Sequence, residues 1–342
     1  PILMGTQNLD DHSRNGHYAS RDYASNFLNS VEKNAVIFTY GDNDTYPLWY
    51  AQEVEGIRRD VRVVNLSLIA VDWYIDLLRR KINDSPALKL TLSSSAYQGD
   101  RRNQMFFVEQ GSQGEMSAQD FMRFVSEDHP QQLSNGGSTE SYLPTRSVYL
   151  PVPKAKVIQM GLAKAGDTTL VDRIPLKMPA QQYMTKDDIA VLDVITSNLW
   201  ERPIYFAVTT QASKFFGLDD YMELEGLALR IMPTRTASDP NYGLIGSGKV
   251  DADKVYENVM KKWRWGNFDK EPTFVDNSYA PSLQSMQLVM RRAAGAFLAE
   301  GKNDKAIALT DQYFKSFPNF NFPYDYRTNY MLEIYVRAGA YK

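Results

Sequence analysis

The chain has 342 residues, 43% of them hydrophobic and 23% charged, with a formal net charge of −3, three histidines and no cysteine. This length exceeds one ordinary core, so two domains are expected. The balanced charge argues against a nucleic-acid-binding surface, and the absence of cysteine excludes disulfides and thiolate metal sites. With so few histidines a histidine-rich zinc site is not expected, and no apolar run is long enough to predict a membrane span. Because the sequence opens with Pro1 and shows no signal peptide, we interpret it as part of a longer or processed chain.

The first third of the chain predicts a βαβ unit. A polar irregular start is followed by a helix expected over about residues 17–31. Strands are expected over Ala35–Tyr40 and Val61–Leu66, with a helix between them that starts near Thr45 and carries Pro47 in its first turn. Two β-branched runs separated by the length of a crossover helix are typical of parallel strands.

The pattern weakens after a further helix expected over about residues 72–82. Residues 83–178 are interpreted as an irregular insertion, because serine-, glycine- and asparagine-rich turns separate short apolar runs there. We expect a helix over 118–126 within it. Short antiparallel strands are expected in the segments 147–152, 156–160 and 168–174.

Regular elements return at Thr185, which is expected to cap a helix ending at Asn198, with strands following at 203–208 and 227–232. This alternation predicts an α/β domain over residues 1–278. We expect a three-layer, mostly parallel sheet with helices on both faces.

An aromatic cluster precedes the C-terminal part of the chain, and two pairs of cationic residues lie nearby in the sequence. Trp263, Trp265 and Phe268 follow a helix expected over 251–262. We interpret them as core packing between the two regions, with a glycan platform as the alternative. We interpret Lys261-Lys262 and Arg291-Arg292 as ordinary solvated charge pairs.

Residues 279–342 predict a separate helical tail that resembles tetratricopeptide repeats. Gly301 and Gly339, 38 residues apart, each close a similar amphipathic segment. A helix pair needs small residues where its helices touch, and Ala294 and Ala306 meet this need. The alternative is an ordinary helical hairpin. Because solenoid repeats need neighbours, we expect the tail to be truncated and more repeats to follow.

The best candidate site is the loop Gly41-Asp42-Asn43-Asp44-Thr45, which leaves a strand where ligands bind in open α/β sheets. Two carboxylates at a helix N-terminus discourage a phosphate and suit a hard cation or sugar hydroxyls. If a divalent cation binds, its candidate ligands are Asp42 and Asp44. The structural alternative is that Asp44 or Thr45 only caps the helix.

Aromatic residues follow this loop and complete the candidate binding set. Trp49 and Tyr50, together with Tyr46, offer a stacking face within the next turn of the helix.

A second candidate cluster is Asp10, Asp11 and His12, with Arg14 close behind. Acids beside a histidine suit a metal site or acid–base work. Adjacent residues of an extended segment point to different sides, so we favour a polar loop in which Asp11 bonds the backbone or Arg14. The two clusters form one site only if folding brings them together.

Several stretches resemble a bacterial family of large membrane proteins. They are Asp10–Gly16, Gly41–Glu53, Asp60–Leu68, Arg202–Ala207 and Arg264–Gly266. In that family a membrane half similar to protein O-mannosyltransferases precedes a soluble half, which often ends in tetratricopeptide-like helices.

The resemblance implies that this chain is the soluble C-terminal region of such a protein, on the periplasmic side of the inner membrane. Its partner would be the membrane half of the same polypeptide, which would hold the transferase chemistry. The family pattern has a further acid where this sequence has Ser13. This departure argues against a metal site at Asp10–Arg14.

Three functional hypotheses follow. In the first, the chain is a non-catalytic recognition region that binds a glycan, an acceptor polypeptide or a partner protein. In the second, it is a metal-assisted hydrolase or transferase that acts on sugars through the loop Gly41–Thr45, with a divalent cation as its cofactor. In the third, it is a protein-interaction scaffold that works through the helical tail. No complete catalytic motif, such as a nucleophile elbow or a Walker loop, supports the second hypothesis directly.

Overall fold

The computed structural model describes residues 2–12, 16–108, 114–132, 138–139 and 141–340, and only the backbone for 9–12, 131–132 and 138–139. The α-helices are α1 (Ile2–His12), α2 (Ala19–Ser30), α3 (Asp42–Glu53), α4 (Asp72–Leu78), α5 (Ser94–Tyr97), α6 (Ala118–Ser126), α7 (Lys154–Gln159), α8 (Lys186–Asn198), α9 (Ala252–Glu257), α10 (Ala280–Ala299), α11 (Asn303–Ser316) and α12 (Tyr326–Ala338). The strands are β1 (Val36–Thr39), β2 (Arg62–Asn65), β3 (Gln104–Phe107), β4 (Met116–Ser117), β5 (Gln131–Gln132), β6 (Ser138–Thr139), β7 (Tyr142–Leu143), β8 (Val148–Pro151), β9 (Arg173–Leu176), β10 (Tyr183–Thr185), β11 (Ile204–Ala207), β12 (Met222–Leu224), β13 (Ala228–Ile231) and β14 (Lys249–Val250).

The main sheet has six strands in the order β14-β12-β13-β11-β1-β2. β1 runs parallel to both β2 and β11, which confirms the predicted βαβ unit around α3. β13 runs antiparallel to β11 and β12, whereas β2, β1, β11, β12 and β14 run in one direction. The sheet is therefore mostly parallel, as expected, with β13 as the reversed strand. The physical reason is the short β12–β13 connection, which is long enough for a hairpin but too short for a parallel crossover. The three-layer arrangement stays a prediction.

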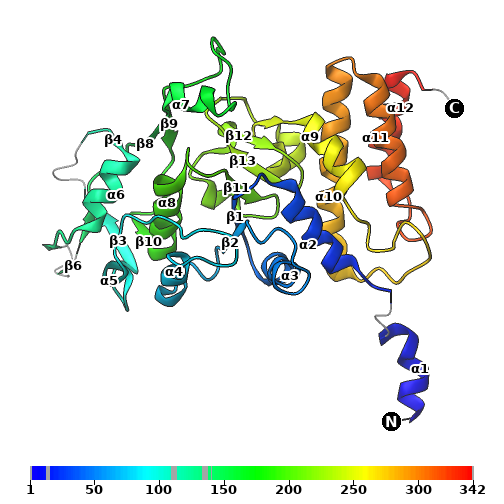
Figure 1. The fold of residues 1–342 in the computed structure, drawn as a ribbon, viewed down its shortest axis with the longest axis horizontal. Helices are drawn as coiled ribbons and strands as arrows, with labels where there is room; N and C mark the ends of the chain where they lie inside the picture. Colours follow the sequence, from blue (N-terminus) through cyan, green and yellow to red (C-terminus); the bar gives the residue numbers. More distant parts are fainter. Residues whose placement is uncertain (1, 13–15, 109–113, 133–137, 140, 341–342) are drawn as a thin grey trace.

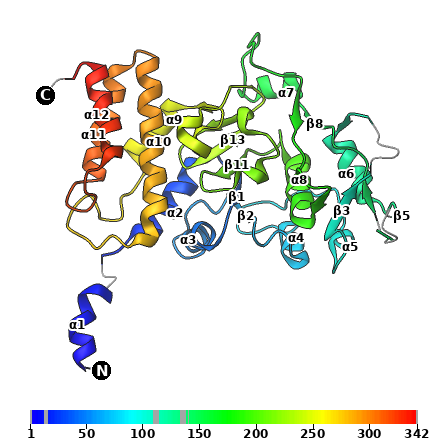
Figure 2. The same ribbon diagram turned by 180° about the vertical axis from the view of Figure 1, so that it is seen from behind.

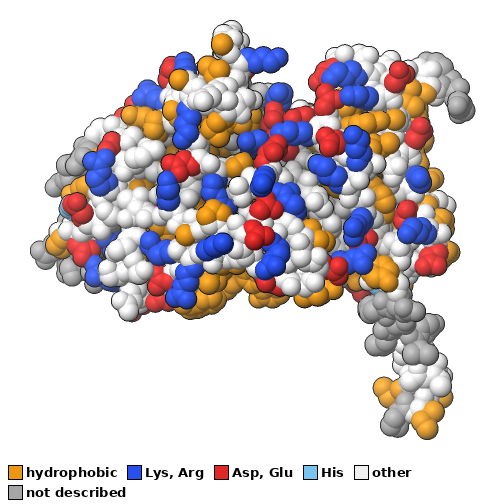
Figure 3. All heavy atoms as spheres, viewed as in Figure 1, with side chains coloured by type: hydrophobic (Ala, Val, Ile, Leu, Met, Phe, Trp, Pro, Cys, Tyr) orange, Lys and Arg blue, Asp and Glu red, His pale blue; other side chains and the backbone are white. Residues whose placement is uncertain are grey.

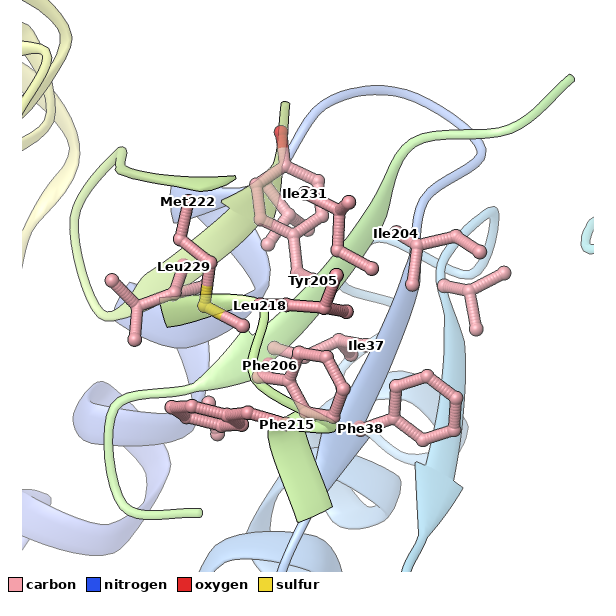
Figure 4. Close-up of a cluster of buried hydrophobic side chains, with 14 of the residues drawn as sticks. Ile37, Phe38, Ile204, Tyr205, Phe206, Phe215, Leu218, Met222, Leu229 and Ile231 are labelled. Carbon is pink, nitrogen blue, oxygen red and sulfur yellow. The ribbon is translucent and has the colours of Figure 1, made fainter. Parts of the chain in front are cut away.

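The core lies where β1 and β11 pair, and both strands are buried along their whole length. The rings of Phe38 and Phe206 stack with centroids 5.0 Å apart across this pairing. Figure 4 shows Ile37, Phe215 and Leu229 gathered around the same two rings. A strand with buried side chains on both sides carries a continuous apolar run, which is what the sequence shows here.

Along the long axis of the molecule the chain runs from α2, beside the tail helices, to α5 and α6 at the far end and then returns to the tail (Figure 1). α8 separates the main sheet from the small sheets of the insertion, and the tail helices lie at the opposite end, a placement that Figure 2 shows from behind. Thr185 and Asp188 form a capping box at the start of α8, as the sequence predicts for Thr185. In the described residues no helix combines the length and the apolar character that crossing a membrane requires.

The insertion contains short strands and helices, as expected, but two elements differ from the prediction. Residues 156–160 do not form a strand, because α7 covers them as a short helix with Val157 as its buried residue. The strand expected over 168–174 lies later, as β9. The helix expected over 118–126 is confirmed as α6, where Ser117 caps the Asp120 amide.

Two helices in the first third also differ from the expectation. The irregular start predicted before residue 17 is helical over Ile2–His12. α4 ends at Leu78 instead of near residue 82. The buried guanidinium of Arg62 accounts for the early end, because it takes the backbone carbonyls of Leu78 and Arg80 that a longer helix would need.

The tail forms three helices, and the predicted small contact residues Ala294 and Ala306 are fully buried. Gly301 and Gly339 adopt positive φ values of 71° and 77° at the ends of α10 and α12, where left-handed glycines commonly end helices. The helical character is therefore confirmed, and the tetratricopeptide nature stays a prediction.

Arg292 of α10 attaches the tail to the body. The prediction that Arg292 is solvated is wrong. Its guanidinium is buried and donates to the carbonyls of Ile245, Ser247 and Gly248. Helical periodicity explains the error, because Arg292 lies on the inward face of α10. Burial lowers its pKa to about 10.

The aromatic cluster packs between body and tail, as predicted. The ring of Trp265 lies 5.8 Å from that of Phe317, and the ring of Phe268 lies 5.6 Å from that of Phe322. Gly266 lies between them, with its amide donating to the Asp22 carboxylate at 3.0 Å. This contact joins the turn after η4 (Asn258–Lys262) to α2.

We expect Gly266→Ala to destabilise the protein. Gly266 has a φ of +61°, and an added Cβ would lie 2.9 Å from the Ala19 Cα, so left-handed strain and a backbone clash combine. The free energy of unfolding should fall by about 3 kcal/mol in a urea titration. Gly301→Ala is the matched control, because it has a φ of +71° with no atom within 4 Å of its Cβ. It should lose about 1 kcal/mol. Equal losses of stability in the two variants would contradict the expected clash between the added Cβ and Ala19.

Candidate functional site

The candidate loop lies at a topological switch point of the sheet. β1 is flanked by β2 on one side and β11 on the other, and the chain leaves β1 through α3 toward β2. Because β1 and β11 are parallel, their carboxyl ends lie at the same edge of the sheet. The loop Gly41–Thr45 follows β1 at this edge, and Thr209 follows β11. Open α/β sheets bind ligands in the crevice at such a point.

α3 begins earlier than the sequence predicts. Its first residue is Asp42, and Gly41 precedes it with a φ of 75°. The Thr45 hydroxyl donates to the Gly41 carbonyl at 2.8 Å, and the Thr39 hydroxyl lies 2.8 Å from the same oxygen of Thr45. Neither Asp44 nor Thr45 is therefore the N-cap, and Pro47 lies in the second turn instead of the first.

Asp44 is the acid that points inward. Its side chain is buried and accepts a hydrogen bond from the Thr209 hydroxyl. Burial raises the pKa of Asp44 to about 6, although hydrogen bonds from Thr209 and from the Tyr40 backbone oppose the shift. A buried acid with a perturbed pKa at a sheet switch point is a candidate for function.

Asp42 and Asn43 point outward and line a cavity of about 280 Å³. The other lining residues come from α2, from α3 and from the start of the tail: Ala19, Ser20, Tyr23, Tyr46, Pro47, Ser278, Tyr279, Ser282 and Leu283. The cavity therefore combines a carboxylate, an amide, several hydroxyls and tyrosine rings. We call it the α2–α3 cavity.

The predicted stacking face is divided between two places. The rings of Tyr46 and Trp49 stack with centroids 5.6 Å apart, but only Tyr46 lines the α2–α3 cavity. Trp49 lines a separate groove on the other side of α3. The Tyr50 hydroxyl donates to Glu55 at 3.1 Å, and this contact raises the pKa of Tyr50. Tyr50 therefore contacts neither space.

The carboxylates of Asp42 and Asp44 do not converge, since one faces the α2–α3 cavity and the other faces Thr209. Among the described residues, no group of three or more His, Asp or Glu side chains is placed to hold a metal ion.

The second acidic cluster does not join the first. Asp10, Asp11 and His12 belong to α1, whose backbone projects away from α3 in both ribbon views (Figures 1 and 2). Their side chains and the whole of Arg14 lie outside the described residues.

Sequence reasoning missed three residues of the site. Thr209 directly follows the strand predicted over 203–208. The rule that ligands bind beyond the carboxyl ends of strands, which selects Gly41–Thr45, therefore applies equally to Thr209. Tyr23 and Ser282 come from distant parts of the chain and meet only in the folded structure. No local pattern marks them.

We expect Asp44→Asn to stabilise the protein in a pH-dependent way. The folded pKa, about 6, exceeds the usual value of 3.8, so the folded state keeps a proton that the unfolded state loses between these values. Ionisation of Asp44 should thus lower the free energy of unfolding by up to about 3 kcal/mol above pH 6 and have no effect below about pH 4.

The variant removes this charge, while its amide oxygen can still accept from Thr209. In urea titrations it should be more stable than the wild type at pH 7.5 and equally stable at pH 4. A stability difference of the same size at both pH values would contradict the raised pKa.

A comparison with protein families gives a match over most of the chain. The family model described as TMEM260-associated domain 2 matches residues 20–254, a range that includes the loop Gly41–Thr45 and Thr209 and ends before the tail. No curated protein matches the chain, and neither does any solved structure. On this match over most of its length, the chain belongs to the TMEM260-associated domain 2 family, a family of TMEM260-like membrane proteins.

Proposed function

We propose that the chain is the recognition region of a larger TMEM260-like membrane protein and that it binds a glycan in the α2–α3 cavity. In this proposal it lies on the periplasmic side of the inner membrane, beside the membrane half of the same polypeptide. That half holds the glycosyltransferase chemistry, as the resemblance to O-mannosyltransferase-like proteins implies. The observation that carries the proposal is the side-chain chemistry of the cavity.

Sugars offer hydroxyl groups on their edges and C–H groups on their faces, so a sugar site needs polar side chains beside aromatic rings. Asp42 and Asn43 supply a carboxylate and an amide, and both are exposed. Within the described part of the chain neither side chain makes a hydrogen bond, so both can meet a ligand. Tyr46 and Tyr279 supply rings at the same cavity. The small volume suits one sugar ring better than an extended chain.

Residues at the start of the helical tail also line this cavity. Ser278 and Tyr279 belong to the turn η5 (Asn277–Tyr279), and Ser282 lies in the first turn of α10. In the proposal the tail is tetratricopeptide-like, with α12 as the first helix of the next repeat. Its packing against α10 and α11 is consistent with that assignment.

Saturation-transfer NMR with methyl glycosides of mannose, glucose and N-acetylglucosamine tests the glycan site. We expect at least one glycoside to bind the wild type. Asp42→Ala should weaken that binding about tenfold, because a charge-assisted hydrogen bond to a sugar hydroxyl is lost.

Asp304→Ala is the matched control, since Asp304 is an exposed acid in the first turn of α11. It should leave binding unchanged. The glycan site is wrong if no glycoside binds or if both substitutions weaken binding equally.

One observation favours the second function, a metal-assisted hydrolase or transferase acting on sugars. Asp44 has a pKa of about 6, which suits a general acid near neutral pH. In this alternative a divalent cation binds at Asp42. Asp44→Asn should then abolish turnover of nitrophenyl glycosides measured with Mg²⁺ or Mn²⁺ while leaving glycoside binding intact.

A further inference from the structure

A second hollow lies on the other side of α3 and has a different chemistry. It has a volume of about 590 Å³ and is walled by α3, β2 and α4. Most of its lining is apolar, with Trp49, Trp73, Tyr74, Val63, Leu77 and Ile82 among its residues. We call it the β2 groove. Figure 3 shows hydrophobic side chains gathered along the lower edge of the molecule, below α3 and α4.

The groove runs along the free edge of the main sheet, because β2 is its last strand. The amides of Arg62 and Leu66 bond to β1, so the backbone groups of the alternate residues face the groove. Both outward groups of Val61 and of Asn65 have partners. The Val61 amide donates to the Arg58 carbonyl at 3.0 Å, and the Asn65 carbonyl accepts from the Ile69 amide at 3.1 Å. The Val61 carbonyl accepts from the Gln52 side chain at 2.8 Å, and the Asn65 amide donates to the Tyr74 hydroxyl at 2.8 Å.

Val63 lies between these two satisfied positions. Its outward N–H and C=O have no hydrogen-bond partner among the described residues. A buried backbone pair without partners is unfavourable, and an unpaired strand edge is a template for another strand. The groove therefore offers the Val63 N–H as a donor and the Val63 C=O as an acceptor between apolar walls.

Exposed aromatic side chains stand at the mouth of the groove. Trp73 is 58% exposed, and its ring meets the Tyr74 ring edge-on at 5.8 Å. An exposed aromatic ring beside an apolar groove is typical of an interaction site. A bilayer would leave the Val63 backbone groups unsatisfied. The polar side chains of the lining, Gln52, Glu53, Arg62 and Asn83, already make hydrogen bonds within the protein, which leaves little of their hydrogen-bonding capacity for a sugar.

One end of the groove is cationic. Ile82 and Asn83 form that end, directly after Arg80 and Lys81 in the chain. Arg59 donates to the Asn83 side chain at 2.5 Å. In the described part of the chain these three cations make no ion pair. Two acids lie at the same end. Glu53 lines the groove and accepts from Asn83 at 2.5 Å, and Asp84 follows Asn83 in the chain, with its amide donating to the Arg59 carbonyl at 3.2 Å. The three cations outnumber these two acids.

We infer that the β2 groove binds an extended polypeptide segment of a partner protein, which adds a strand beside Val63. Alternate apolar side chains of this segment enter the groove between Trp49 and Trp73, and acidic residues of the segment face Arg80 and Lys81. Strand addition supplies main-chain hydrogen bonds, while the pockets for alternate side chains supply selectivity. The inference concerns a site apart from the α2–α3 cavity and depends on neither Asp42 nor Asn43.

An array of synthetic ten-residue peptides tests this inference. The peptides alternate valine or phenylalanine with threonine and carry two aspartates at one end or none. The best binder is then titrated in solution against tryptophan fluorescence. We expect the acidic peptides to bind most tightly and to weaken with added salt. Hydrogen exchange of the Val63 amide should slow on binding.

Two substitutions, each with a matched control, separate the contacts. Trp73→Ala should weaken binding at least tenfold, because an aromatic anchor is lost. Tyr326→Ala, which removes a 70% exposed ring from α12, is its control and should have no effect. Lys81→Glu should weaken the acidic peptides alone, whereas Lys261→Glu, at an exposed lysine outside the groove, should not. Circular dichroism verifies that each variant is folded.

A peptide N-methylated on alternate amides decides between strand addition and simple apolar adhesion. It should lose binding, because it cannot donate to the Val63 carbonyl. The inference is overturned if the N-methylated peptide binds equally well or if no peptide binds. It is also overturned if phosphatidylcholine vesicles or methyl mannoside, but not peptides, change the fluorescence of Trp73.

Discussion

The parallel pairing of β1 with β11 is the contact on which the rest of the structure depends. The two strands lie far apart in the sequence, yet Val36 to Phe38 align in register with Ile204 to Phe206. Their side chains form the centre of the core, where Phe38 stacks on Phe206 and both rings are fully buried. Because the strands are parallel, their carboxyl ends coincide, and Asp44 reaches Thr209. The candidate site is thus a consequence of this register.

The second constraint is the attachment of the helical tail to the body. Arg292 holds the carbonyls of the loop before β14, and Trp265 packs against Phe317. These contacts hold the start of α10 against α2, and there Ser282 and Tyr279 complete the α2–α3 cavity. The tail therefore shapes the proposed glycan site, even though the family match ends before it. Truncating the tail would remove one wall of that cavity.

The two hollows on either side of α3 differ in chemistry because α3 presents different residues to each. Asp42 and Asn43 occupy its exposed first turn, whereas Trp49 and Gln52 lie further along it and turn toward β2. Tyr46 lies between them and lines both hollows. One helix thus separates a polar site from an apolar one.

The sequence by itself determined the elements whose signal is local. The βαβ unit, the α8 cap at Thr185, β11 and the helical tail follow from periodicity and turn chemistry, and the loop Gly41–Thr45 follows from its place after a strand. Only the tertiary structure decided which acid is buried, that β13 runs antiparallel, that Arg292 is inside and that Asp10–His12 lie away from the loop. The physical reason is that burial, strand direction and cavity walls arise between segments distant in sequence. Residue spacing shows which face of a helix or strand is apolar, but it does not show which other element packs against that face.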